Sequence, residues 1–141
     1  MAIRTADAEW RGNLAQGSGH MRFGSGAFDG PHDFRSRMAD GKGTSPEELL
    51  GAAHDGCFSM ALALPLTNAG VTVKSIHTTA RVHLEERDGG WSIDKIDLNT
   101  EASISDVAAA AFEEHAQNAK KNCPISRALS GVDIHLRAKL L

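Results

Sequence analysis

The segment from Ser45 to Gly70 most constrains the fold, because it can form one long helix between two regions of a different kind. Ser45 can cap a helix, Pro46 suits its first turn, and Glu48 completes a capping box with Ser45. Asn68-Ala69-Gly70 then ends the helix. Apolar residues recur at spacings of three and four, which predicts that this face turns toward the core: Leu49, Ala53, Cys57, Met60 and Leu64.

The regions on both sides of this helix alternate polar and apolar residues, which is the two-residue period of strands. The expected strands cover residues 5–14, 19–23, 32–38, 71–86, 91–101 and 131–140. The fourth and fifth of these form a hairpin around Arg87-Asp88-Gly89-Gly90, and the register of the fifth shifts between Ile93 and Ile96. Two more helices are expected at residues 106–121, capped by Ser105, and at residues 124–129. The pattern predicts an α+β fold.

Composition limits the kinds of partner. A chain of 141 residues that is 41% hydrophobic can bury one core, so we expect a single domain over residues 1–141. The 15 basic residues are scattered and the net charge is −3, which argues against nucleic acid and anionic membranes as partners. No apolar run approaches the roughly 18 residues that span a bilayer, and MAIRTADAEW lacks a signal-peptide core. We therefore expect a cytoplasmic protein that acts on a small molecule.

The two cysteines occupy unlike settings. Cys57 lies within the long helix, and Cys123 stands in KNCPISRAL, where Pro124 disfavours helical geometry at Cys123 and favours a new helix start. Cytoplasmic thiols are kept reduced, so transient oxidation suits the pair better than a permanent disulfide. A helix N-terminus should lower the pKa of Cys123 and prepare it to attack an oxidised Cys57.

Cys57 needs a nearby positive charge to react as a thiolate, because burial in an apolar setting raises a thiol pKa. Arg35 and Arg37 are the candidates, since alternation places both on one face of the strand expected at 32–38, and the pattern does not separate them. Glu47 is the carboxylate available to an arginine, but it lies roughly 15 Å along the helix from Cys57 at 1.5 Å per residue. If Glu47 organises the Cys57 site, it does so from a neighbouring subunit, which predicts a homodimer.

Two longer motifs, GKGTSPEELLGAAHDGCFSMAL and NCPISRAL, resemble the OsmC and organic hydroperoxide resistance family of bacterial peroxidases, and its OsmC branch in particular. The resemblance extends from AEWRG to the last strand, with a departure at Pro65, which should bend or weaken the long helix. It implies an intertwined α+β homodimer of antiparallel sheets, with a long central helix that carries the first cysteine. It also implies reduction of organic hydroperoxides and hydrogen peroxide with an external dithiol, of lipoyl type in some members, and no cofactor.

The same resemblance assigns roles to four residues. It implies that Cys57 is the peroxidatic cysteine, that Cys123 is the resolving cysteine, and that Arg37 and Glu47 are the catalytic arginine and the glutamate at the helix start. The alternatives are a thiol switch or small-molecule binding protein on the same fold, and a purely structural disulfide. His54 and Cys57 could in principle share a zinc ion, but no second ligand pair has useful spacing.

Overall fold

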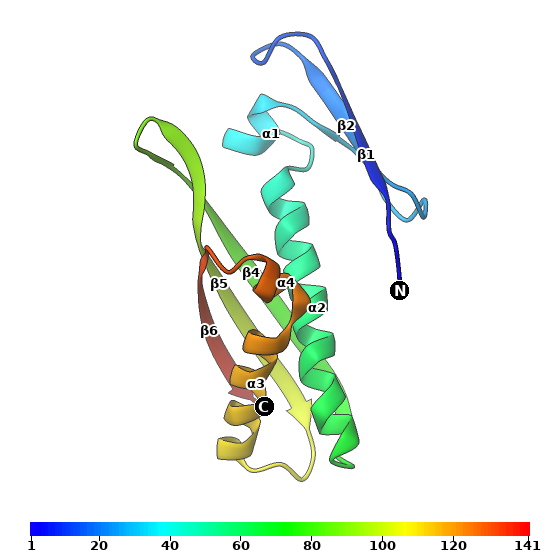
Figure 1. Ribbon diagram of the computed structural model, residues 1–141, viewed down its shortest axis with the longest axis vertical. Coiled ribbons are helices and arrows are strands. Elements are labelled where there is room, and N and C mark those ends of the chain that lie inside the picture. The colour runs from blue at the N-terminus through cyan, green and yellow to red at the C-terminus, as the bar shows by residue number, and fades with distance from the viewer. The chain divides into compact units, whose positions relative to one another are not determined.

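The structure is a computed structural model that describes all residues from Met1 to Leu141. The chain forms two compact units, Met1–Leu49 and Leu50–Leu141. Ten elements follow one another along the chain (Figure 1): β1 Ala6–Arg11, β2 Ser18–Phe23, β3 Asp29–His32, α1 Phe34–Met38, α2 Pro46–Asn68, β4 Val73–Arg87, β5 Gly90–Ile104, α3 Ala109–Asn122, α4 Pro124–Ala128 and β6 Asp133–Leu140. The expected α+β fold is confirmed.

The first unit contains an antiparallel sheet in the order β1-β2-β3. Its strands approach closely at Gly19, where an added Cβ would lie 2.5 Å from the carbonyl oxygen of Glu9 and 2.7 Å from the His32 ring. None of the large apolar side chains of this unit is buried, and Trp10 and Phe23 retain 38% and 39% of their accessible surface. This sheet therefore has no apolar core of its own.

The strand expected at 32–38 is wrong in its second part, because β3 ends at His32 and the helix α1 follows. Asp33 caps α1 by accepting the Ser36 N–H at 2.7 Å, while the Ser36 hydroxyl accepts the Asp33 N–H at 2.9 Å. This reciprocal cap outweighs the alternating pattern. Arg35 and Arg37 consequently do not share a face, since residues two apart on a helix point in directions about 160° apart.

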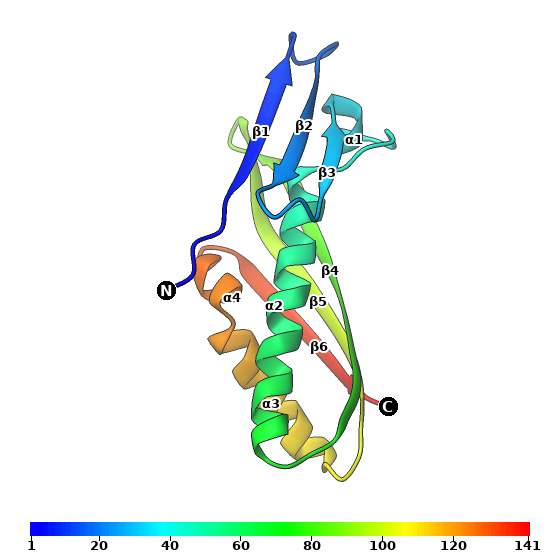
Figure 2. The same ribbon diagram turned by 90° about the vertical axis from the view of Figure 1, so that its right-hand side faces the viewer.

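The second unit is a sheet in the order β4-β5-β6 with α2 and α3 on one face (Figure 2). β4 and β5 pair antiparallel, whereas β6 pairs with β5 in parallel. This sheet is therefore mixed, and the expectation of purely antiparallel sheets is wrong here. The hairpin turns at Asp88 and Gly89, whose φ angles of 52° and 81° suit a tight turn. The expected register shift is confirmed: His83 faces Lys95 but Leu84 faces Ile93, so one residue of β5 is unpaired.

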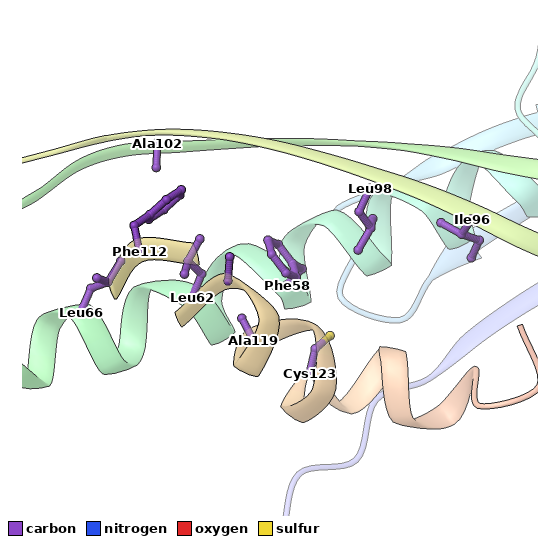
Figure 3. Close-up of a cluster of buried hydrophobic side chains, with 10 residues drawn as sticks. Phe58, Leu62, Leu66, Ile96, Leu98, Ala102, Phe112, Ala119 and Cys123 are labelled. Atoms are coloured by element: carbon purple, nitrogen blue, oxygen red, sulfur yellow. The ribbon is translucent and has the colours of Figure 1, made fainter. Parts of the chain in front are cut away.

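The core side of α2 differs from the expected one. Its fully buried residues are His54, Phe58, Leu62 and Leu66. The last three pack against β5 and α3 (Figure 3). Met60 and Leu64, both expected inside, are 75% and 63% exposed, and Cys57 lies at the margin between the two faces. The helix carries apolar residues on more than one face, so spacing alone did not identify the face that the sheet covers.

The ends of α2 follow the sequence signals with one exception. Ser45 Oγ accepts the Glu48 N–H at 3.1 Å, as expected of a cap. The Glu48 carboxylate accepts the Thr44 hydroxyl at 3.0 Å, so the reciprocal half of the expected capping box is not made. The helix continues through Pro65 to Asn68, and Gly70 follows with a φ of 77°.

By length and composition alone, α2 is long and apolar enough to cross a membrane. Its mean hydropathy reaches 1.3 and 28% of the apolar window is buried within the chain. Core helices pass the same test, and Phe58, Leu62 and Leu66 of α2 are core residues.

The second long helix begins later than expected. α3 starts at Ala109 with Ala108 as an N-cap that offers no side-chain hydrogen bond, so Ser105 is not the cap. Asp106 has a positive φ of 61°, which takes the chain out of helical geometry at the expected start. Cys123 ends α3 and directly precedes α4, so the expected junction at Cys123 is confirmed.

Candidate functional site

The fold brings the two cysteines together. Cys57 Sγ on α2 and Cys123 Sγ at the α3–α4 junction lie 2.8 Å apart, and both are free thiols. Cys123 is completely buried, whereas Cys57 is partly exposed. An outside reactant therefore meets Cys57 first, and Cys123 is already placed to bond to its sulfur.

Within this unit the surroundings of Cys57 hold the sulfur in its protonated form. Burial raises the pKa of the Cys57 thiol, and the neighbouring Cys123 thiol raises the pKa further. A hydrogen bond from the Ile125 backbone N–H lowers the Cys57 pKa but does not reverse the total. A cation is the missing contribution if Cys57 is to react as a thiolate.

Arg37 and Glu47 form a forked ion pair in the first unit. Arg37 Nε and Nη2 donate to Glu47 Oε1 at 3.1 and 2.7 Å, and Nε also lies 3.3 Å from Oε2. The Glu47 side chain is 10% exposed and that of Arg37 is 43% exposed. The buried Glu47 carboxylate thus fixes the edge of the Arg37 guanidinium that carries Nε and Nη2. Arg37 Nη1 makes no hydrogen bond.

The four candidate residues thus form two pairs, one in each compact unit. The thiol pair can undergo oxidation to a disulfide, and the ion pair can present a fixed positive charge. Arg35, the other arginine that the sequence allowed, lies in the same helix as Arg37 but pairs with Asp40 at 3.8 Å, and both side chains of this pair are largely exposed. The contacts therefore favour Arg37 over Arg35 as the residue held for a function.

A third contact beside the thiols was not expected from the sequence. His54 Nε2 lies 2.8 Å from Ser126 Oγ, which joins α2 to α4, and both residues are buried. Burial lowers the pKa of His54, so its ring is neutral at neutral pH. The sequence carries a signal for this contact, because His54 and Cys57 have the same spacing as Cys123 and Ser126. The zinc hypothesis used only the first of these two motifs.

Asp55 follows His54 on α2 and is perturbed for a related reason. Burial raises the pKa of Asp55 to about 6, although the Ala80 N–H and the charge of His77 act in the opposite direction. Its Oδ1 atom is buried without a hydrogen-bond partner. The charged form of Asp55 therefore destabilises the fold at the contact between α2 and β4.

An apolar hollow of about 940 Å³ lies beside Cys57 in the second unit. Its lining comes mainly from the exposed side of α2 and from α3, and includes Cys57, Met60, Leu64, Pro65, His115 and Pro124. A hydrocarbon group in this hollow would lie next to the partly exposed sulfur.

Residues 39–137 match the model of the family described as OsmC-like protein. The chain is 43% identical over 127 residues to a protein of Escherichia coli named peroxiredoxin OsmC, with 89% of each chain covered. It is 31% identical over 107 residues to a Staphylococcus epidermidis protein named organic hydroperoxide resistance protein-like 1, with 74% of this chain and 76% of that protein covered. A crystal structure of the organic hydroperoxide resistance protein OhrB of Bacillus subtilis superposes with a TM-score of 0.69 at 25% identity, covering 97% of this chain and 98% of the other.

Proposed function

Because this chain belongs to the OsmC-like protein family, we propose that it is a cysteine-based peroxidase that reduces organic hydroperoxides to alcohols, and hydrogen peroxide to water. The observation that carries the proposal is the 2.8 Å approach of a partly exposed thiol, Cys57, to a buried one, Cys123. The names of the Escherichia coli and Staphylococcus epidermidis relatives support the same activity in oxidative-stress defence.

Cys57 begins the reaction as a thiolate that attacks one peroxide oxygen. The O–O bond breaks, an alcohol or water leaves after taking a proton, and Cys57 becomes a sulfenic acid. The Cys123 thiolate then attacks the Cys57 sulfur, the S–O bond breaks, and hydroxide leaves as water once protonated. An external dithiol reduces the resulting disulfide and restores both thiols.

Arg37 supplies the positive charge that Cys57 lacks in its own unit. Its forked contact with Glu47 fixes the guanidinium, and the free Nη1 group can donate to the peroxide or to the thiolate. Glu47 is thereby a positioning residue, because it acts through Arg37.

The working molecule is an intertwined homodimer in which each active site contains groups from both subunits. Support comes from the first unit, whose three-stranded sheet buries no large apolar side chain and needs a partner surface for stability. The exposed Met60 and Leu64 on α2 give a second surface of the same kind. A second copy, and not lipid, lies over this surface and leaves the hollow beside Cys57 open to the peroxide. The whole chain 1–141 acts as one functional domain in the cytoplasm.

The apolar hollow beside Cys57 accommodates the organic group of the hydroperoxide. Its lining of Met60, Leu64 and Pro65 offers apolar contacts that hydrogen peroxide does not use. The protein should therefore prefer a bulky hydroperoxide to hydrogen peroxide at equal concentration.

The test is steady-state turnover. Reduced protein is mixed with a large excess of cumene hydroperoxide and a dithiol such as dihydrolipoamide, and peroxide loss is followed for the wild type and for Cys57→Ser. Many equivalents consumed by the wild type, and none above background by the variant, support the peroxidase. Consumption that stops after one equivalent per chain would instead identify a thiol switch.

A further inference from the structure

The contact between His54 and Ser126 joins the two segments that carry the reacting cysteines. His54 lies on α2 three residues before Cys57, and Ser126 lies in α4 three residues after Cys123. Residues three apart on a helix share a face, so the two segments meet as matched pairs: thiol to thiol and imidazole to hydroxyl.

Three polar contacts hold the turn that begins at Cys123 against α2. They are the approach of the two sulfurs, the hydrogen bond from the Ile125 N–H to the Cys57 sulfur, and the 2.8 Å contact of His54 Nε2 with Ser126 Oγ. Two of these three involve the Cys57 sulfur, whose bonding changes when it is oxidised. Only the contact between His54 and Ser126 is made by groups that do not react.

Ile125 and Leu129 also pack, partly buried, against the core, but the turn has few other polar restraints. α4 is only five residues long, its N-cap makes no side-chain hydrogen bond, and Pro124 contributes no backbone donor. Ser126 is the only residue of α4 that is buried. Nδ1 of the buried His54 ring has no hydrogen-bond partner. Loss of the Ser126 hydroxyl would therefore leave the His54 imidazole without any hydrogen bond.

We propose that His54 and Ser126 are positioning residues that hold the Cys123 turn against α2 after Cys57 has been oxidised, and so set the rate of disulfide formation. The proposal rests on the proposed function for its place in the cycle. The step concerned forms the S–S bond between Cys123 and the Cys57 sulfenic acid, breaks the S–O bond and releases water. Cys123 is not a reactant in the earlier attack of Cys57 on peroxide, and in the reduced protein the Cys123 and Ile125 contacts with the Cys57 sulfur remain, so this step should change little.

A single-turnover experiment separates the two steps. Reduced Ser126→Ala is mixed with cumene hydroperoxide, and sulfenic acid and disulfide are followed by quenching and intact mass. We expect oxidation of Cys57 within twofold of the wild type and disulfide formation slowed about tenfold, which is the effect of losing one buried hydrogen bond. The slower step should also increase the sulfinic acid formed in excess peroxide.

Matched variants distinguish positioning from general loss of stability. Ser126→Thr keeps the hydroxyl and should restore the rate. His54→Gln can place an amide near the position of Nε2 and should retain more of the rate than His54→Asn, whose shorter side chain cannot. Ser59→Ala is the control, because Ser59 on α2 loses a 2.8 Å hydroxyl contact with Thr78 without touching the Cys123 turn.

A second readout does not depend on peroxide. The disulfide equilibrium of each variant is measured in buffers of reduced and oxidised dithiothreitol, which reports how well the fold holds the two thiols together. We expect the equilibrium for Ser126→Ala to shift about tenfold toward the dithiol, and that for Ser59→Ala to stay unchanged.

The outcomes for the two proposals can be told apart. If the wild type does not consume peroxide, the proposed function fails, while the dithiothreitol equilibrium still tests the positioning role. If Ser126→Ala equals the wild type in both disulfide formation and equilibrium, the positioning role is wrong even when the protein is a peroxidase.

Discussion

At the scale of single residues, Arg37 is set apart by how it is held. Glu47 engages its Nε and Nη2 atoms and leaves Nη1 without a partner in the chain. A lysine at this position can supply the positive charge, but it cannot make the forked pair of hydrogen bonds to Glu47. We expect Arg37→Lys to slow the oxidation of Cys57 by about a hundredfold, which is typical of losing one preorganised donor to a developing charge.

The matched control for this change is Arg35→Lys, because Arg35 lies in the same short helix with an exposed partner, Asp40. Its rate of sulfenic acid formation should stay within twofold of the wild type. Equal losses in the two variants would indicate damage to α1 and would contradict a specific role for Arg37.

Asp55 predicts an unusual pH dependence of stability. Burial raises its folded pKa from 3.8 to about 6, so the folded chain binds this proton more tightly than the unfolded chain. The charged form therefore destabilises the fold above pH 6, and this cost disappears as the pH falls through about 6 toward 3.8.

Asp55→Asn should therefore stabilise the protein at pH 7.5 by an amount on the order of 1 kcal/mol, reduced by solvent screening of a partly exposed carboxyl. The gain should shrink toward zero near pH 4. Urea unfolding at the two pH values measures the difference in free energy of unfolding between Asp55→Asn and the wild type. The other titrating groups are the same in both proteins, so their contributions cancel. A gain that does not change with pH would show that the Asp55 charge is not its cause.

Residue types and spacing predicted the approach of the two cysteines, because a mid-helix thiol and a thiol at a helix junction suggested a redox pair. They did not separate Arg35 from Arg37, since that distinction depends on the helix α1 and on the contact with Glu47. They also missed the contact of His54 with Ser126, which joins residues 72 positions apart. A long-range contact of this kind is set by packing and not by local pattern.

At the scale of elements, α2 has one face in the core and one that stays exposed in the single chain. Leu62 is fully buried, whereas Leu64, two residues later, is 63% exposed. We expect Leu62→Ala to lower the free energy of unfolding by about 2–5 kcal/mol through lost contacts and a residual cavity.

Leu64→Ala is the control, because it removes the same atoms from an exposed position. It should lower the free energy of unfolding by much less than Leu62→Ala when unfolding is measured at low protein concentration. If the two substitutions cost the same at every protein concentration, the assignment of the core face of α2 would be wrong.

The elements also show where local pattern was sufficient. The β4–β5 hairpin was predictable because its turn residues and alternating apolar residues agree, and even its register shift was visible in the spacing of Ile93 and Ile96. The segment after His32 was not, because Asp33 and Ser36 cap a helix within an alternating sequence. The start of α3 was misjudged because the backbone at Asp106 leaves helical geometry in favour of a turn.

At the scale of the whole molecule, the proposed dimer predicts complementation between inactive variants. If Arg37 of one subunit serves Cys57 of the other, a mixed dimer of Arg37→Gln with Cys57→Ser contains one complete site. Co-refolding equal amounts should restore about a quarter of wild-type activity, because half of the dimers are mixed and each has one of two sites. A mixture that stays inactive, although mixed dimers are detected, would place Arg37 and Cys57 in the same subunit.

The central claim is that peroxide oxidises Cys57 and that Cys123 then closes a disulfide with it. Its most direct test is the intact mass of reduced wild type, Cys57→Ser and Cys123→Ser after one equivalent of cumene hydroperoxide. We predict a loss of about 2 Da in the wild type, a gain of about 16 Da in Cys123→Ser, and no change in Cys57→Ser. An unchanged wild type, or oxidation of Cys123 in Cys57→Ser at the wild-type rate, would contradict the claim.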